Sequence, residues 1–252
     1  AASDVYKRQD IKSMDNYTYA HSVNVAVISL VLGISLNLPK RHLKYLCIGA
    51  LIHDIGKSFI PKEILQKPSR LTEDEFKIIE NHPKEGYDFI KKTYNFSSHI
   101  NSIVLQHHER FDGLGYPNKL LGEEINHLAR IVSVADVYDA LTSDRPYKRA
   151  LCPSDAVEYL MSNAGSAFDF NIVNIFSKVI IPFPAGTIVS LSNGDIGIVK
   201  ETLPNFPLIP IIEIIKSDNS KKIGSIINLI EKLSVVISNI PVSYTHLTLP
   251  TK

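Results

Sequence analysis

The chain has 252 residues and a formal net charge of +1, and 44% of its residues are hydrophobic against 21% charged, which is typical of a globular protein. The near-zero net charge argues against the broad basic surface with which proteins bind duplex nucleic acid. Two cysteines, Cys47 and Cys152, make no disulfide framework and indicate a reducing compartment, so we expect a cytoplasmic protein.

Both ends of the sequence are atypical. Residues 1–9 and 242–252 resemble translated adapter sequence, so we treat them as non-native scars and leave them out of the fold prediction. On that interpretation the natural protein extends further, chiefly on the N-terminal side, where a regulatory sensor or receiver domain is an open alternative.

A helical domain is predicted over residues 10–180. Its first apolar run, from Val23 to Leu36, is shorter than the roughly 20 residues that cross a bilayer, so we expect a buried helix and no membrane span. Apolar periodicity, capping residues and early prolines divide the domain into helices. The predicted helices are Tyr17–Leu36, Pro39–Ile55, Thr72–Glu80 with a capping box, one from His82-Pro83, one capped by Ser97 or Ser98, Asn126–Leu141, Pro153 to about Asn163, and about 169–180.

From Pro182 the composition changes to short β-rich runs separated by turn signals. Asn193-Gly194 between two apolar runs is a strong hairpin signal. We therefore predict a small antiparallel β domain over 181–241, reached through the proline-rich segment 181–184. The fold class is thus mainly α, with a helical bundle followed by a small antiparallel β domain.

Histidines and aspartates stand at helix ends or within helices, each in an apolar setting. A lone histidine there is more often a satisfied core residue, but a carboxylate such as Asp54 or Asp136 is costly to bury unless it is paired or bound to a metal. Imidazole and carboxylate ligands together suit Fe, Mn, Zn or Ni. We therefore predict a metal centre built from His21, His53, Asp54, His82, His107, His108 and Asp136.

A glycine-containing loop follows the paired histidines directly. It runs from Glu109 to Pro117, contains Gly113 and Gly115, and closes with Tyr116-Pro117. Side chains that can hold a metal are thus placed beside a loop that can contact a ligand. We expect a functional site here.

These motifs resemble the HD-GYP domain, a subclass of the HD superfamily of metal-dependent phosphohydrolases. The resemblance covers about residues 15–170 and implies an HD-type helical bundle. Enzymes of this family hydrolyse the bacterial second messenger cyclic di-GMP at a centre of two or three metals, often iron. The motifs are His21, His53-Asp54-Ile-Gly-Lys57, His82-Pro83, His107-His108-Glu109 through Tyr116-Pro117, and Ala135-Asp136 through Arg145-Pro-Tyr-Lys148.

The resemblance also implies how the ligands are divided between the ions. One ion takes His21, His53, Asp54 and Asp136, and the other takes Asp54, His82, His107 and His108, with Asp54 as the bridge. Three-metal members carry a glutamate four residues before the first histidine, where this chain has Tyr17. We therefore expect two divalent ions, with Fe as the first choice and Mn, Zn or Ni as alternatives.

Four further residues are expected to contact the substrate. Arg145 and Lys148 resemble the pair with which the family holds phosphates. Lys57 is expected to reach a phosphate oxygen or the leaving group, although the end of a helix favours a lysine in any case. Tyr116 either packs against a guanine or orders its loop, and we slightly favour the second role.

The expected function is a phosphodiesterase that hydrolyses cyclic di-GMP to pGpG, with further cleavage to GMP left open, through a water activated by two metals. One alternative is another cyclic dinucleotide or a nucleotide as the substrate. The other is a non-catalytic module that senses cyclic di-GMP or binds a partner. The retention of all predicted metal ligands counts against this alternative. Binding of partner signalling domains through the Gly-Tyr-Pro loop and formation of a homodimer are left open.

Overall fold

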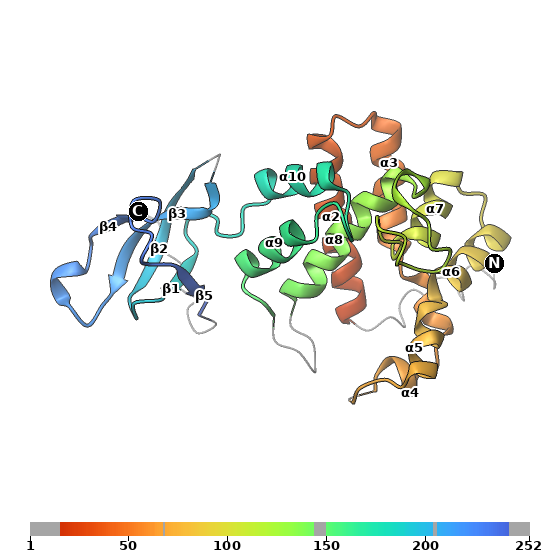
Figure 1. Ribbon diagram of the computed structural model, residues 1–252, viewed down its shortest axis with the longest axis horizontal. Helices are drawn as coiled ribbons and strands as arrows, with labels where there is room; N and C mark the ends of the chain where they lie inside the picture. The colour runs from red at the N-terminus through yellow and green to blue at the C-terminus, as the bar shows by residue number, and fades with distance from the viewer. Residues whose placement is uncertain (1–15, 68, 144–149, 204–205, 242–252) are drawn as a thin grey trace, which may run out of the picture. The chain divides into compact units, whose positions relative to one another are not determined.

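The computed structural model describes residues 16–67, 69–143, 150–203 and 206–241. Contacts between Cα atoms divide the chain into two compact units. Among the described residues, the helical unit comprises those up to 150 together with 159–175, and the strand unit comprises 151–158 and those from 176 to 241 (Figure 1). The predicted mainly helical fold with an antiparallel β part is confirmed.

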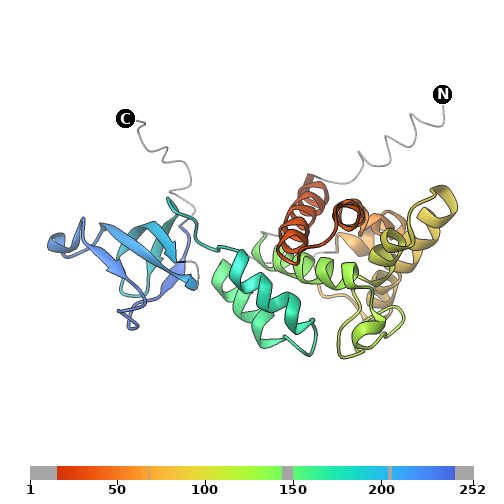
Figure 2. The same ribbon diagram turned by 90° about the horizontal axis from the view of Figure 1, so that it is seen from above.

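The helical unit is formed by helices of different lengths, with an extended loop between α7 and α8 (Figures 1 and 2). In chain order they are α2 (Asn16–Ser35), α3 (Lys40–Ile52), η1 (Ile55–Phe59), α4 (Lys62–Leu65), α5 (Glu73–Glu80), α6 (His82–Thr93), α7 (Ser98–Gln106), η2 (Gly122–Glu124) and α8 (His127–Thr142). Two more, α9 (Pro153–Ser162) and α10 (Phe170–Val179), contribute residues to both units.

Local signals set several helix starts as predicted. The Thr72 hydroxyl accepts a hydrogen bond from the Glu75 amide, and the Glu75 carboxylate accepts one from the Thr72 amide, which together make the capping box of α5. Asn126 caps α8 by accepting from the Leu128 amide. Ser97 occupies the N-cap position of α7, but its side chain makes no capping hydrogen bond.

The second helix is shorter than predicted. The sequence predicted a helix through Ile55, whereas α3 ends at Ile52 and a separate 3₁₀ turn, η1, follows. The reason is a tertiary contact, because a Cβ atom on Gly56 would lie 1.9 Å from the carbonyl oxygen of His82. The backbone of η1 therefore rests directly on the start of α6, which a continued α3 could not do.

Helix α8 forms the centre of the helical unit. It packs against α2, α3 and α7, while α2 packs on α3 and α6 packs on α7. Most of its residues are buried, from Leu128 to Asp139, so α8 presents both apolar and acidic side chains to the interior. The polar groups of this helix must therefore find partners on its neighbours.

Helix α2 is long and apolar. Within the described residues it is the one helix that could cross a membrane by length and composition, over Thr18–Ser35 with a mean hydropathy of 1.4. Core helices of globular proteins also meet this test, and α2 contributes buried polar side chains such as His21 and Ser29. Its close packing on α3 is evident at Gly33, where a Cβ atom would lie 2.8 Å from Leu43 and Leu46.

The strand unit is one antiparallel sheet with the strand order β4-β3-β2-β1-β5. Gly194, with φ of +87°, completes the predicted hairpin between the first two strands, and its amide donates to the Leu191 carbonyl. The strands are β1 (Ile188–Leu191), β2 (Ile196–Leu203), β3 (Phe206–Lys216), β4 (Ile226–Asn228) and β5 (Ile237–Asn239).

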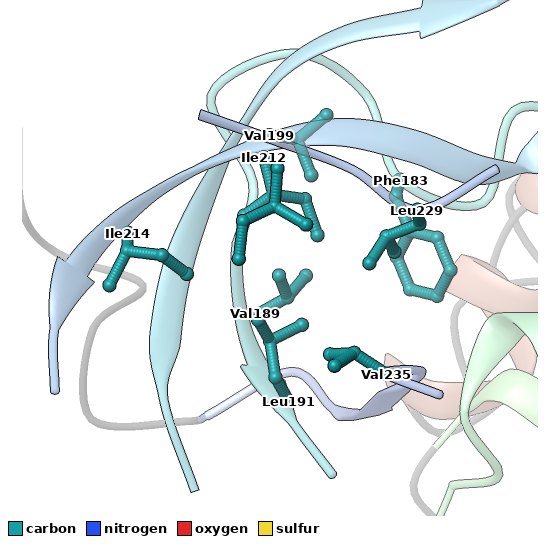
Figure 3. Close-up of a cluster of buried hydrophobic side chains, with 9 residues drawn as sticks. Phe183, Val189, Leu191, Val199, Ile212, Ile214, Leu229 and Val235 are labelled. Atoms are coloured by element: carbon teal, nitrogen blue, oxygen red, sulfur yellow. The ribbon is translucent and has the colours of Figure 1, made fainter. Parts of the chain in front are cut away.

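Apolar side chains from every strand but β5, and from the segments around them, close over one buried cluster (Figure 3). The cluster consists of Phe183, Val189, Leu191, Val199, Ile212, Ile214, Ile227, Leu229 and Val235. Cys152, at the start of α9, packs against it from outside the sheet. The strand unit thus includes residues before 181, the position where the sequence placed the domain boundary, and the domain boundaries stay a prediction. The predicted scars at 1–9 and 242–252 lie outside the described residues.

Candidate metal centre

All seven residues predicted as metal ligands are brought together by the helical unit. Their nitrogen and oxygen atoms form two adjoining groups, and within each group the atoms lie no more than 4.8 Å apart. The helices α2 and α8 supply side chains from their interiors, while α3, α6 and α7 supply them from their ends. The first group is His21, His53 and Asp136, and the second is Asp54, His82, His107 and His108.

A contact between two glycines fixes the position of Asp54 relative to His82. Besides the approach of Gly56 to His82, a Cβ atom on Gly86 would lie 3.0 Å from the Gly56 amide nitrogen. A side chain at Gly56 would separate η1 from α6, and one at Gly86 would crowd the same contact. The glycine of the motif His53-Asp54-Ile-Gly-Lys57 therefore has a structural role in bringing the two groups together.

Asp54 lies between the two groups and directs one oxygen to each. Its Oδ1 atom is 3.2 Å from Nε2 of His82 and 3.7 Å from Nε2 of His107. Its Oδ2 atom is 3.4 Å from Nε2 of His53 and 3.7 Å from Nε2 of His21. This is the arrangement that a carboxylate needs in order to bridge two cations.

Three of the histidines have their outer ring nitrogen held by the backbone. The Nδ1 atoms of His53, His82 and His107 lie 2.6, 2.7 and 2.9 Å from the carbonyl oxygens three residues earlier. A carbonyl oxygen only accepts, so each Nδ1 carries the hydrogen, and in the neutral imidazole, the form that binds a metal, each Nε2 directs a lone pair inward. Metal-binding histidines are commonly oriented in this way.

Several of these inward atoms have no ordinary partner. Nε2 of His53 and Oδ1 of Asp54 are buried and make no hydrogen bond to any residue that the structure describes, and Nε2 of His82 lies 3.2 Å from Nε2 of His107. Two lone pairs at that separation repel each other unless a proton or cation lies between them, and unpaired buried polar atoms are costly. The donor set and its unsatisfied atoms fit divalent transition-metal ions.

The electrostatics keep most ligands in the form that binds a metal. Burial lowers the pKa of His107 to about 4 and also lowers that of His108, so both imidazoles are neutral at pH 7. Burial alone would raise the pKa of Asp54 and of Asp136, but neighbouring Lys57 and His53 lower the first and the hydrogen bond from His21 lowers the second. Both carboxylates are therefore ionised.

His21 differs from the other histidines in its surroundings. Burial lowers its pKa, yet the hydrogen bonds to Asp136 and Asp139 outweigh that effect and raise it to about 9. Nε2 of His21 lies 3.1 Å from Oδ1 of Asp136, and Nδ1 lies 2.6 Å from Oδ2 of Asp139. Asp139 stands in the motif from Ala135 to Lys148 but was given no role there, although it follows Asp136 by three residues and so shares its helix face.

The exposed side of the centre is formed by Lys57 and His108, whose side chains are 29% and 23% exposed. Asp54, His53 and His107 are almost completely buried. A ligand from solvent therefore reaches the centre past Lys57 and His108. The Lys57 ammonium donates a hydrogen bond to Oδ2 of Asp54.

The loop after the paired histidines is tightly built. The buried Glu109 carboxylate accepts hydrogen bonds from the amides of Asn118 and Leu120, at 2.7 and 3.0 Å. Gly115 has no room for a side chain, since a Cβ atom would lie 2.2 Å from the amide nitrogen of Arg110. The backbone at Gly115 therefore packs directly against the start of the loop at Arg110. Glu109 was not among the predicted site residues.

Tyr116 packs beside His108, with their ring centroids 4.9 Å apart, and the peptide bond to Pro117 is cis. Burial raises the pKa of Tyr116 above its usual value, so its hydroxyl is neutral. Tyr116 thus contacts a predicted ligand as well as its loop. Arg145 and Lys148, the other predicted substrate contacts, lie outside the described residues.

A model of the HD domain family matches residues 8–172. The chain belongs to the HD domain family. The predicted HD-GYP subclass is confirmed by this match together with its relatives. A cyclic di-GMP phosphodiesterase of Pseudomonas aeruginosa is 38% identical over 211 residues, which are 84% of this chain and 51% of that protein.

Two further proteins show the breadth of the resemblance. A 3′3′-cGAMP-specific phosphodiesterase of Vibrio cholerae is 34% identical over 61% of this chain and 33% of its own length. The solved structure of an HDG"Y"P protein from Bdellovibrio bacteriovorus matches with a TM-score of 0.54 at 24% identity, over 65% of this chain and 52% of that one, and so shares the fold. The chain spans about half or less of the length of these relatives.

Proposed function

We propose that this chain is a metal-dependent phosphodiesterase that hydrolyses cyclic di-GMP to pGpG. The observation that carries the proposal is the division of the Asp54 oxygens between two buried groups of histidines, within 3.2–3.7 Å of four imidazole nitrogens. A bridging carboxylate between two nitrogen-rich groups is suited to holding a pair of divalent ions. The name of the Pseudomonas relative supports cyclic di-GMP as the substrate.

The proposed centre holds two ions, each with its own group and with Asp54 shared. Iron is the first choice, with Mn, Zn or Ni as alternatives, because mixed imidazole and carboxylate ligands suit these metals. When bound, such a pair supplies an activated water and neutralises the charge that develops on a phosphodiester.

The remaining roles belong to the residues of the chain. The Lys57 ammonium, at the exposed side of the centre and beside Asp54, is placed to bind a phosphate oxygen or the leaving oxygen of the substrate. Tyr116 shapes the wall next to His108 and orders the loop. Arg145 and Lys148 are proposed to bind the phosphates, for which the planar guanidinium of arginine is well suited.

A second candidate substrate is the mixed dinucleotide 3′3′-cGAMP, which the name of the Vibrio relative favours. The deciding experiment loads the chain anaerobically with Fe(II) or Mn(II) and incubates it with each dinucleotide, followed by chromatography of the products. Faster formation of pGpG from cyclic di-GMP supports the proposal, and faster cleavage of 3′3′-cGAMP supports the second candidate. Binding without product, in protein that holds two ions, would show a non-catalytic module.

A further inference from the structure

Asp139 is a buried carboxylate, 4% exposed, to which neither the sequence motifs nor the proposed reaction gives a role. Its two oxygens both engage side chains of α2. Oδ2 lies 2.6 Å from Nδ1 of His21, and Oδ1 accepts a hydrogen bond from Nδ2 of Asn24 at 2.9 Å. The carboxylate is thus held in place and aimed at the outer nitrogen of a predicted ligand.

We propose that Asp139 is a positioning residue that makes the His21 group the tighter of the two metal positions, so that the first ion to bind enters there. The inference rests on the proposed metal-dependent function and deepens it. The geometry places two carboxylates of α8, one helical turn apart, on opposite nitrogens of one imidazole. Asp136 faces Nε2 of His21 at 3.1 Å, and Asp139 faces Nδ1.

The second nitrogen of His21 has a different kind of partner from those of three other ligands. His53, His82 and His107 each donate to a neutral backbone carbonyl, whereas His21 donates to a carboxylate. A hydrogen bond to a charged acceptor is stronger than one to a neutral acceptor, and a carboxylate behind an imidazole increases its strength as a metal ligand. Among these four, His21 is therefore the strongest donor.

The distribution of negative charge favours the same group. The His21 group includes Asp136, has Asp139 directly behind His21, and shares Asp54 with its neighbour. The other group contains Asp54 as its one carboxylate, with three imidazoles. A divalent cation is attracted more strongly where more carboxylates surround it at short distance, so the two positions should differ in affinity.

The test uses the whole chain, stripped of metal with a chelator and then titrated with Co(II). Calorimetry and visible absorption monitor the titration. The wild type should bind two equivalents with distinct affinities. Asp139→Asn keeps the shape of the side chain but removes its charge, and should weaken the tighter site by about 10- to 100-fold while the weaker site changes little. In Asp139→Asn the visible absorption of the first Co(II) ion to bind should also change. A general loss of stability would not change this absorption.

Two comparisons separate this role from a structural one. Asp169 is also buried, at 8% exposed, and its carboxylate accepts from Nη1 of Arg130 at 2.6 Å, outside both groups of predicted ligands. Asp169→Asn should lower stability but leave both Co(II) affinities unchanged. Asn24→Ala removes the hydrogen bond that aims Asp139 and, because Asn24 is exposed, should fold and weaken the tighter site several-fold.

The outcomes are distinct. A wild type that binds two ions while Asp139→Asn and Asn24→Ala leave the tighter site unchanged, or weaken both sites equally, overturns the inference and leaves the proposed function standing. An equal weakening in Asp169→Asn also overturns it. A wild type that binds no ion overturns the proposed function itself.

Discussion

The ammonium nitrogen of Lys57 lies 2.5 Å from Oδ2 of Asp54, the oxygen that faces His21 and His53, and not beside Oδ1, which faces His82 and His107. Lys57 therefore approaches the centre from the side of the His21 group. Because its side chain is partly exposed while Asp54 is buried, the lysine stands between the centre and solvent. An anionic substrate that arrives from solvent meets this positive charge first.

Lys57→Met should lower kcat while leaving the metal content unchanged. Methionine keeps the length of the side chain but cannot stabilise charge on a phosphate or leaving oxygen, and loss of one such donor typically costs about 10²- to 10³-fold in kcat. Elemental analysis and steady-state kinetics on the same preparation measure both quantities. Lys67→Met is the control, because Lys67 pairs with Glu75 outside the groups of predicted ligands. Loss of metal in Lys57→Met would show that the lysine supports the centre and not the substrate.

Asp54→Ala should remove both ions, whereas Asp136→Ala should remove one. The reason is the position of Asp54 between the two groups, while Asp136 is one of the three members of the His21 group and faces the second group only with Oδ2, 3.9 Å from Nδ1 of His108. Turnover of cyclic di-GMP should fall below detection in Asp54→Ala. The measurement is metal per chain after gel filtration, with circular dichroism to show that both variants fold. Retention of one full equivalent in Asp54→Ala would contradict the bridging role.

Gly56→Ala should destabilise the helical unit and weaken metal binding together. The added Cβ atom would lie 1.9 Å from the His82 carbonyl oxygen, and a backbone atom cannot move aside as a flexible side chain can. Overpacking typically costs about 1–3 kcal/mol, and we expect the upper part of that range. Because the clash separates η1 from α6, the distance between Asp54 and His82 should increase, and the affinity of the bridged ions should fall.

Gly165→Ala is the matched control for this substitution. Gly165 has a positive φ of 80° but open space around it, with no atom within 4 Å of the place that a Cβ atom would take. Alanine there should cost stability through backbone strain alone and should leave metal binding intact. Thermal unfolding and Co(II) titration are measured for both variants. Equal metal affinities in the two would argue that the contact of Gly56 with His82 does not set the distance between Asp54 and His82.

The features that the sequence predicted are those that depend on local interactions. The starts of α5 and α8 follow from Thr72 and Asn126, whose side chains bond to amides two or three residues away. The predicted end of α3 was wrong because it depends on the contact of Gly56 with His82. This contact joins segments 26 residues apart in sequence, so no local pattern predicts it. Strand β4 carries no strong local signal for a similar reason, since its three residues depend on pairing with β3.

The predicted ligands were visible in the sequence because a carboxylate or imidazole in an apolar run is costly without a partner. Asp139 is also a carboxylate that is costly to bury without a partner, but it lies near the end of α8, where an acidic residue is easily taken for a surface group. Its role depends on α2 lying against α8, which brings His21 and Asn24 within hydrogen-bond distance. Residues that support ligands across helices are thus harder to predict than the ligands themselves.

Glu109→Gln should loosen the loop that carries Tyr116 without removing metal. The carboxylate accepts from the amides of Asn118 and Leu120 with separate oxygens, and glutamine must turn an amide hydrogen toward one of these donors. An unpaired buried group of this kind costs about 1–3 kcal/mol, so hydrogen exchange at the two amides should accelerate by about 10- to 100-fold. Glu124→Gln is the control, since Glu124 is exposed and accepts from the Leu121 amide in the same region. Because the loop forms the wall beside His108, KM should rise more than kcat falls; unchanged exchange at Asn118 and Leu120 would mean that Glu109 does not hold the loop.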